Sequence, residues 1–284
     1  MKTLKKILKW TGIVLAILVL TGISLYFIYL RPFMQKMKEV HVVQYDKELT
    51  LVLGGGGNSG ILVSDSLVLV IDTKMDEAAE QLASQVKALA GSKHILVVNT
   101  HFHPDHEKGN AYYKGQMILA GGNYTPEFWL KQNGSEGVPT VWLKDRMEIP
   151  MGDEHVTILN LGKNVHTASD VVVYLKKRKM LFAGDVILNK QAPAMFGVAD
   201  PAGYLDAFNT LPKQFEIQTI VPGHGPVGGM DVLENFRQYF LDMQTAAADP
   251  SKKDGLVAKY KDWGQIPFAM SPGATIRAFQ KDKH

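Results

Sequence analysis

Residues 101–106 read His-Phe-His-Pro-Asp-His and follow the apolar run Ile95–Val98 after two polar residues. Imidazole and carboxylate are ligands of zinc, and iron and manganese also accept them. His101 and His103 are two residues apart, so in an extended segment they face the same side and can reach one ion. If a helix begins at Pro104, Asp105 and His106 point elsewhere and can serve a second ion. A polar loop with incidental histidines is the alternative, but a chain with only nine histidines would rarely contain this string by chance.

Three later residues could complete such a site. His166 precedes the strand-like run 171–175, Asp185 ends the run 180–185, and His224 follows the apolar segment 217–221. Taken alone, each has an ordinary structural explanation, such as a hydrogen-bonded histidine beside a strand or a helix N-cap. Rigid sheets place functional groups on the loops at strand ends, so we expect these residues to gather at one edge.

The order of these motifs resembles the metallo-β-lactamase superfamily: HxHxDH, then His, then Gly-Asp, then Pro-Gly-His-Gly. Residues 54–63 and 67–73 look like that family's opening hairpin, and the resemblance covers about residues 40 to 230. It implies an α+β fold, an αββα sandwich with two sheets back to back and helices outside. It also implies two metal ions and their ligands. One ion would be held by His101, His103 and His166, the other by Asp105, His106 and His224, with Asp185 bridging them.

The same resemblance implies that Asp72 fixes the ligand loop, although a polar residue at a strand end would look the same. Two zinc ions could activate water for attack on a carbonyl carbon, with Asp105 as the catalytic residue that orients the water or accepts its proton. The expected function is therefore a zinc-dependent hydrolase acting on an ester, thioester, amide or β-lactam. Three alternatives stay open: an iron-dependent sulfur dioxygenase of the same superfamily, a phosphodiesterase, and a non-catalytic zinc-binding module.

The N-terminal residues differ in composition from the rest of the chain. Trp10–Leu30 contains no charge, and its 21 residues would rise about 31 Å as a helix, enough to cross a bilayer core of roughly 30 Å. A cleaved signal peptide usually has a shorter apolar region of about 7 to 15 residues. Lysines precede the run, which places the N-terminus in the cytoplasm. We therefore expect residues 1–38 to be a cytoplasmic N-terminus plus one transmembrane anchor in the cell (inner) membrane. The catalytic domain would lie on its extracytoplasmic side.

The distribution of charge along the chain indicates which kinds of molecule the protein binds. The whole chain has a formal net charge of +3, but residues 1–38 supply seven positive charges and no acid, which leaves −4 for residues 39–284. This balance argues against a nucleic-acid partner and for a small-molecule substrate. The chain has no cysteine, so disulfides and a thiolate zinc ligand are excluded.

Residues 39–248 are expected to form the catalytic domain, and 249–284 a peripheral helical tail. The tail contains Lys252, Lys253, Lys259 and Lys261, which suggest a solvated helix face or a basic binding region. The glycine run 54–57 predicts a hairpin turn or a flap over the site, because it lacks the Gly-Lys-Ser/Thr of a phosphate loop. Candidate polar groups of the substrate pocket are Asn110, Asn123, Tyr124 and Tyr204.

Apolar runs and helical spacing predict the elements. Strands are expected at 41–45, 49–53, 61–64, 67–71, 95–99, 116–119, 139–143, 155–160, 171–175, 179–183 and 217–221, and helices at 76–90, 125–132, 201–210 and 231–247.

Overall fold

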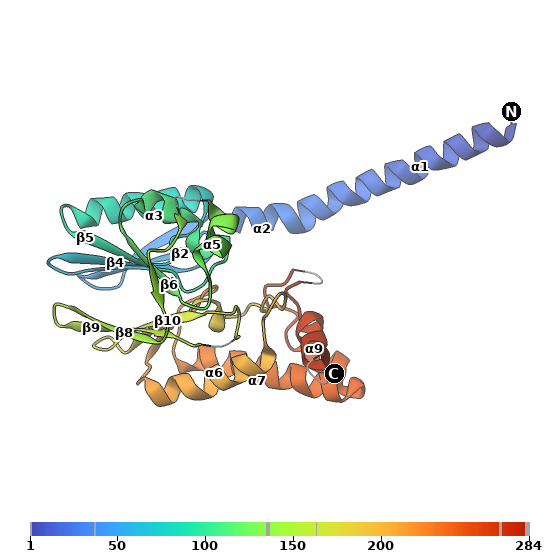
Figure 1. The fold of residues 1–284 in the computed structure, drawn as a ribbon. Helices are drawn as coiled ribbons and strands as arrows, with labels where there is room; N and C mark the ends of the chain where they lie inside the picture. The colour runs from blue at the N-terminus through green and yellow to red at the C-terminus, as the bar shows by residue number, and fades with distance from the viewer. Residues whose placement is uncertain (1, 37, 135–136, 163, 267–268, 282–284) are drawn as a thin grey trace.

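The computed structural model describes residues 2–36, 38–134, 137–162, 164–266 and 269–281. The chain begins with a long helix that projects away from the body (Figure 1). It comprises α1 (Lys2–Leu25), the π-helical turn η1 (Tyr26–Leu30) and α2 (Arg31–Lys36). Within it, Trp10–Leu30 is long and apolar enough to cross a membrane, and no part of this segment is buried against the protein. By length and composition it could be a membrane anchor or a signal sequence.

The body contains two sheets. The first has seven strands in the order of the sequence, antiparallel from β1 to β4 and parallel from β4 to β7. Its strands are β1 (Val40–Gln44), β2 (Leu49–Gly54), β3 (Ser59–Val63), β4 (Leu67–Ile71), β5 (His94–Val98), β6 (Met117–Gly121) and β7 (Val141–Leu143). The second has the order β12-β11-β10-β9-β8, and its β11 and β12 are parallel. Its strands are β8 (Arg146–Met151), β9 (Glu154–Asn160), β10 (Val171–Leu175), β11 (Met180–Phe182) and β12 (Thr219–Val221).

Helices cover the outer faces of both sheets (Figure 1). Helix α3 (Asp76–Ala90) lies on the first sheet, and α6 (Pro201–Gln214) and α7 (Met230–Ala248) lie on the second. The predicted sandwich of two sheets between helices is thus confirmed. The remaining helical elements are α4 (Pro104–Glu107), η2 (Lys108–Tyr113), α5 (Pro126–Asn133), η4 (Gly184–Val186), η5 (Pro250–Lys252), α8 (Lys253–Ala258) and α9 (Pro272–Lys281).

Strand β4 shows why the two faces of the first sheet are both apolar. Alternate side chains point to opposite faces of a strand. Leu69 and Ile71 are buried between the sheets, whereas Val68 and Val70 are buried beneath α3. A strand covered on both sides therefore reads as an uninterrupted apolar run, as in residues 67–71.

The helix predicted at 76–90 has the predicted bounds, and Thr125 caps α5 by accepting a hydrogen bond from the Phe128 amide. Strand β8 is not among the predicted strands, since it contains Pro150 and charged residues and mostly exposes one face at the edge of its sheet. The segment 249–284, expected as a peripheral tail, is helical in α8 and α9. Its Tyr260, Ile276 and Phe279 are buried in the core beneath the second sheet, so this segment contributes to the packing there. Residues 1, 37, 267–268 and 282–284 of the predicted anchor and tail segments lie outside the described residues.

One end of the sandwich is joined by a charge cluster. Arg178, in the turn between β10 and β11, donates to Asp46 (2.7 Å) and Glu48 (2.7 Å) in the turn between β1 and β2. It also donates to the buried Glu154 (2.8 Å) at the start of β9. The cluster therefore links the two sheets through one guanidinium whose side chain is only 8% exposed.

Candidate metal centre

The seven predicted ligands meet at the opposite end of the sandwich. Parallel strands place the loops at their C-terminal ends on one edge of a sheet. His101, His103, Asp105 and His106 follow β5, and Asp185 and His224 follow β11 and β12. His166 comes from the loop that leads into β10.

The first group of ligand atoms comes from three histidines. His103 Nδ1 lies 3.0 Å from His101 Nε2 and 2.9 Å from His166 Nε2. Asp185 is the fourth member of this group, with Oδ2 3.4 Å from His166 Nε2. His103 is still extended and precedes α4, so it shares a side with His101 as the spacing predicts.

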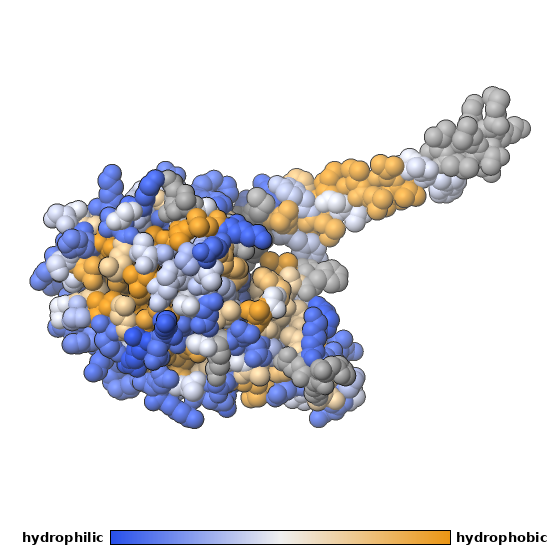
Figure 2. Space-filling model, in the orientation of Figure 1, coloured by the Kyte–Doolittle hydropathy of each residue, from blue (hydrophilic) through white to orange (hydrophobic). Residues whose placement is uncertain are grey.

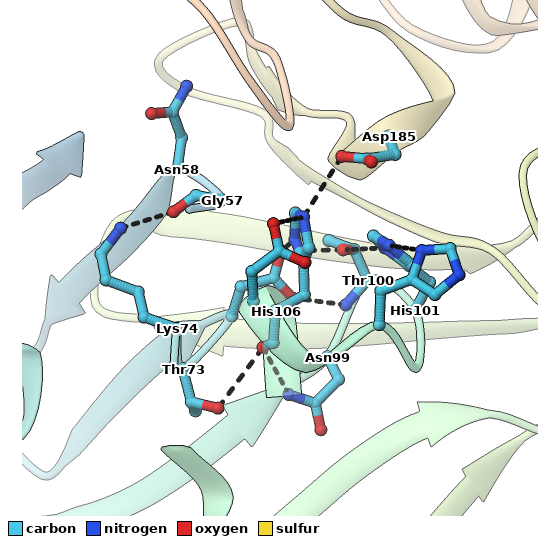
Figure 3. Close-up of polar contacts among 12 residues, drawn as sticks. Gly57, Asn58, Thr73, Lys74, Asn99, Thr100, His101, His106 and Asp185 are labelled. Atoms are coloured by element: carbon cyan, nitrogen blue, oxygen red, sulfur yellow. Dashed lines mark hydrogen bonds and ion pairs between the residues drawn. The ribbon is translucent and has the colours of Figure 1, made fainter. Parts of the chain in front are cut away.

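The second group contains Asp105, His106 and His224. His224 Nε2 lies 3.1 Å from Asp105 Oδ2 and 3.4 Å from His106 Nε2. Asp185 also reaches this group. Its Oδ1 lies 3.2 Å from His106 Nε2 (Figure 3). The same oxygen lies 3.4 Å from His224 Nε2. The two carboxylate oxygens of Asp185 therefore face different groups.

Asp72 orients the second group from outside, as the resemblance implied. His106 Nδ1 lies 2.8 Å from Asp72 Oδ2, and both side chains are buried. The Thr100 amide and hydroxyl donate to the same carboxylate at 2.7 and 2.8 Å. A His106 Nδ1–H that donates to Asp72 leaves the Nε2 lone pair turned toward the other ligands.

Two further contacts fix the histidines of the first group. His101 Nδ1 lies 3.1 Å from Thr100 Oγ1, whose own proton is directed to Asp72. His166 Nδ1 lies 2.9 Å from the Tyr204 hydroxyl, which donates to the Asp185 carbonyl oxygen at 3.2 Å. Each ring can thus donate outward from Nδ1 and present the Nε2 lone pair inward, the arrangement of metal-binding histidines.

Burial and charge act in opposite directions on the histidines. Burial lowers the pKa of His101 well below its usual value and that of His166 to about 3, so both rings are neutral. Burial would also lower the pKa of His106 and His224, but the carboxylates around them outweigh it. The pKa of His106 is well above its usual value, and that of His224 rises to about 9.

The two carboxylates of the site, one in each group, require positive charge beside them. Burial opposes ionisation of Asp105 and Asp185, yet the neighbouring histidines lower the pKa of both. Asp185 Oδ1 is buried and accepts no hydrogen bond within the described part of the chain. A divalent cation would supply that charge and give Oδ1 a partner, so the donor set fits a metal ion.

Two glycines allow the backbone to approach these ligands. A Cβ on Gly57 would lie 2.4 Å from His106 Cε1, and one on Gly223 would lie 2.1 Å from Asp185 Oδ1. Gly57 belongs to the predicted glycine run, which forms the hairpin loop between β2 and β3. Gly223 is the glycine before His224, so the Pro-Gly-His-Gly motif is needed for packing as well as for a ligand.

Lys74, which was not predicted to be part of the site, is fully buried beneath the glycine loop. Its Nζ donates to the carbonyls of Gly54 (2.6 Å) and Gly57 (2.5 Å), as Figure 3 shows for Gly57. Burial lowers the pKa of Lys74 to about 7. A lysine after a strand is usually solvated, and nothing in its sequence context signalled burial.

None of the four predicted pocket residues is among those that line the cavity beside the ligands. Asn110 is buried among Thr73, Asn99 and Gly137, and Tyr204 is buried behind His166. Asn123 and Tyr124 bond to the Ala168 backbone. The cavity beside the ligands, of about 760 Å³, is lined by other residues, which include His103, Asp105, Asp185, His224, Asn189, Lys190 and Phe196.

Comparison with known proteins identifies the family. Residues 52–224, more than half of the chain, match the sequence profile described as the metallo-beta-lactamase superfamily. The chain belongs to this superfamily. Its members are enzymes that bind metal ions, usually zinc, and hydrolysis is their common chemistry.

Individual relatives are distant. A metallo-beta-lactamase type 2 of Bacteroides fragilis is 23% identical over 64% of this chain and 74% of that protein. The human acyl-coenzyme A thioesterase MBLAC2 is 23% identical over 49% of this chain and 59% of that protein. A solved metallo-beta-lactamase from Pontibacter korlensis superposes with a TM-score of 0.61 at 22% identity, over 72% of this chain and 99% of that chain. At this identity the structural likeness shows the fold alone.

Proposed function

We propose that this protein is a membrane-anchored, zinc-dependent hydrolase that cleaves a carbonyl-centred bond. One zinc ion would be held by His101, His103 and His166 and a second by Asp105, His106 and His224, with Asp185 between them. The observation that carries the proposal is the position of Asp185. Its Oδ2 faces His166 of the first group, and its Oδ1 faces His106 and His224 of the second.

Zinc supplies two kinds of chemistry at such a site: it polarises a carbonyl oxygen and lowers the pKa of water toward about 7. The chain's own residues hold the geometry for this reaction. Asp72 and Tyr204 fix the rings of His106 and His166 from behind. Asp105 is partly exposed in the cavity wall and keeps a lowered pKa, so it is ionised and able to orient water through its carboxylate.

The type of scissile bond is inferred from charge and from the relatives. Residues 39–284 carry a net charge of −4, which does not favour a phosphate polymer. The relatives named above are a β-lactamase and a thioesterase, and both names imply attack at a carbonyl carbon. An ester, thioester, amide or lactam is therefore the proposed substrate bond.

The anchor is part of the proposal. Trp10–Leu30 lies outside the core, and its bare apolar surface would be stable in a bilayer. The lysines before it favour a cytoplasmic N-terminus and place the catalytic domain on the other side. Protease added to cells whose outer barrier has been opened should digest the domain. Full protection, or a mature protein that starts near residue 31, would contradict this topology.

A substrate panel tests the reaction. The full-length protein should hydrolyse at least one of four chromogenic substrates: an ester, a thioester, an amide and a lactam. A chelator should abolish this activity, and added zinc should restore it. A phosphodiester, assayed at two salt concentrations, serves as the contrast. Turnover of the phosphodiester alone, falling steeply with salt, would overturn the proposal in favour of a nuclease.

A further inference from the structure

The cavity beside the ligands has one wall made by the N-terminal helix. Ile28, Tyr29 and Pro32, at the body-proximal end of the apolar segment, line the same cavity as His103 and His224. Ile28 is 63% exposed and Tyr29 55% exposed. The site and the end of the segment proposed to span the membrane therefore share one space.

The facing wall is also apolar. Phe196 lies between β11 and α6, is 55% exposed, and has its ring centroid 5.7 Å from that of His103. Ala194, Ile266 and Met270 continue this wall, and backbone bridges join Met270 to both of the others. Figure 2 shows apolar surface on the N-terminal helix and again on the body, beneath the end of the helix that joins it. Apolar surface gathered in a cavity is typical of a ligand site.

The cavity thus has two chemically different parts. Imidazole and carboxylate groups form one part, and aliphatic and aromatic side chains from the helix and the body form much of the other. Polar side chains also line the cavity, namely Asn189, Lys190, Gln191, Asp262 and Gln265. A ligand that satisfies both has a polar, hydrolysable group and an apolar chain. If the helix spans a bilayer, residues 28–32 lie at its surface, where such amphiphiles concentrate.

We propose that the substrate is a membrane-resident amphiphile with a carbonyl bond attached to a single aliphatic chain. The aliphatic chain of the substrate lies between residues 28–32 of the N-terminal helix and the wall formed by Phe196, Ile266 and Met270. Its carbonyl group lies beside His103 and His224. This substrate class rests on the function proposed above. The volume of about 760 Å³ is within the range of small-molecule sites, roughly 300–1,000 Å³.

A series of acyl chains tests the inference in the full-length protein, reconstituted in lipid nanodiscs. The series, from two to ten carbons, is built on the carbonyl bond that the substrate panel identifies. Each methylene buried between the two walls should raise kcat/KM about two- to fourfold, until the cavity is full. Turnover that does not depend on chain length would overturn this inference and leave the proposed hydrolase standing. Turnover of no carbonyl substrate would overturn both.

Matched variants test where the aliphatic chain of the substrate lies in the cavity. Phe196→Ser should lower kcat/KM for the ten-carbon substrate about tenfold and that for the two-carbon substrate less than about twofold. Tyr112→Ser, an equally exposed aromatic outside the cavity wall, should change neither. On the helix, Ile28→Ser should act as Phe196→Ser does, whereas its exposed neighbour Phe27→Ser should not. Equal losses on both substrates, or equal effects of variant and control, would contradict the proposed position of the chain.

Photocrosslinking gives a readout independent of turnover. A ten-carbon alkyl amide with a terminal diazirine, placed in the same nanodiscs, should label body residues 194–198 or 264–266. Phe196→Ser should reduce this label. Label confined to the N-terminal helix would show only lipid contact and would overturn the inference.

Discussion

The two ends of the sandwich bring buried charges together in different ways. At one end, Asp46, Glu48 and Glu154 surround Arg178, so the chain itself supplies the positive charge. At the other end, Asp105 and Asp185 converge with five histidines, and no ion pair or hydrogen bond joins either carboxylate to a described lysine or arginine. Buried carboxylates are unstable without a compensating charge. The Arg178 end therefore contains its own compensating charge, whereas the ligand end is suited to bind a cation.

Substitution of a ligand should have the largest effect and should act on activity. His103→Ala removes the ring that lies between His101 and His166, and so would remove a ligand of the first proposed zinc ion. The loss of several kcal/mol of electrostatic stabilisation corresponds to a fall in kcat/KM on the order of a thousandfold. Thermal unfolding should change less than activity, since the loop is not part of the hydrophobic core. Retention of wild-type activity would contradict the role of His103.

Substitution at the Arg178 end should change the stability of the protein and not the activity of the metal site. Arg178→Met leaves the fully buried Glu154 without its charged partner, which should lower the free energy of unfolding by about 3 kcal/mol. Denaturant unfolding measures this change. Lys177→Met is the matched control, because its pair with Asp153 is exposed and should contribute little to stability. A large fall in kcat for Arg178→Met, with an unchanged free energy of unfolding, would contradict this prediction, because the Arg178 end would then affect activity and not stability.

Asp72 should affect metal binding without being a ligand. Asp72→Asn keeps the size of the side chain but weakens its contact with His106 Nδ1 and the hydrogen bonds from Thr100. We expect metal affinity to fall about 10- to 100-fold, as is typical when the outer partner of a ligand is changed. Competition with a chromophoric chelator measures the affinity. An unchanged affinity would show that the ligand loop holds its shape without Asp72.

Lowering the pH should slightly reduce the stability that the Arg178 cluster contributes. The hydrogen bond from Arg178 lowers the pKa of Asp46 to about 2, below its ordinary value of 3.8. The contribution of Asp46 is therefore fully present above about pH 4 and is lost as the pH falls toward 2. The difference in stability between wild type and Arg178→Met should narrow over that range by less than about 1 kcal/mol. A constant difference would show that Asp46 contributes nothing to the cluster.

The two ends also differ in how far the sequence predicted them. The ligands are chemically distinctive residues at strand ends in a recognisable order, and the structure brings all seven together. The roles of Arg178 and Lys74, and the buried position of Tyr204 behind His166, could not be predicted, because nothing local distinguishes a buried arginine, lysine or tyrosine from an exposed one. The cavity wall was missed for a similar reason. Phe196, Ile28 and Ile266 are far apart in sequence and become neighbours only through the tertiary fold.

Metal content tests the central proposal most directly. Full-length protein purified without added metal should contain about two zinc ions per chain by elemental analysis. Asp185→Ala should lower this number, because Asp185 faces both ligand groups, whereas Arg178→Met should leave it unchanged. A single iron, or no tightly bound metal in folded wild-type protein, would contradict the account.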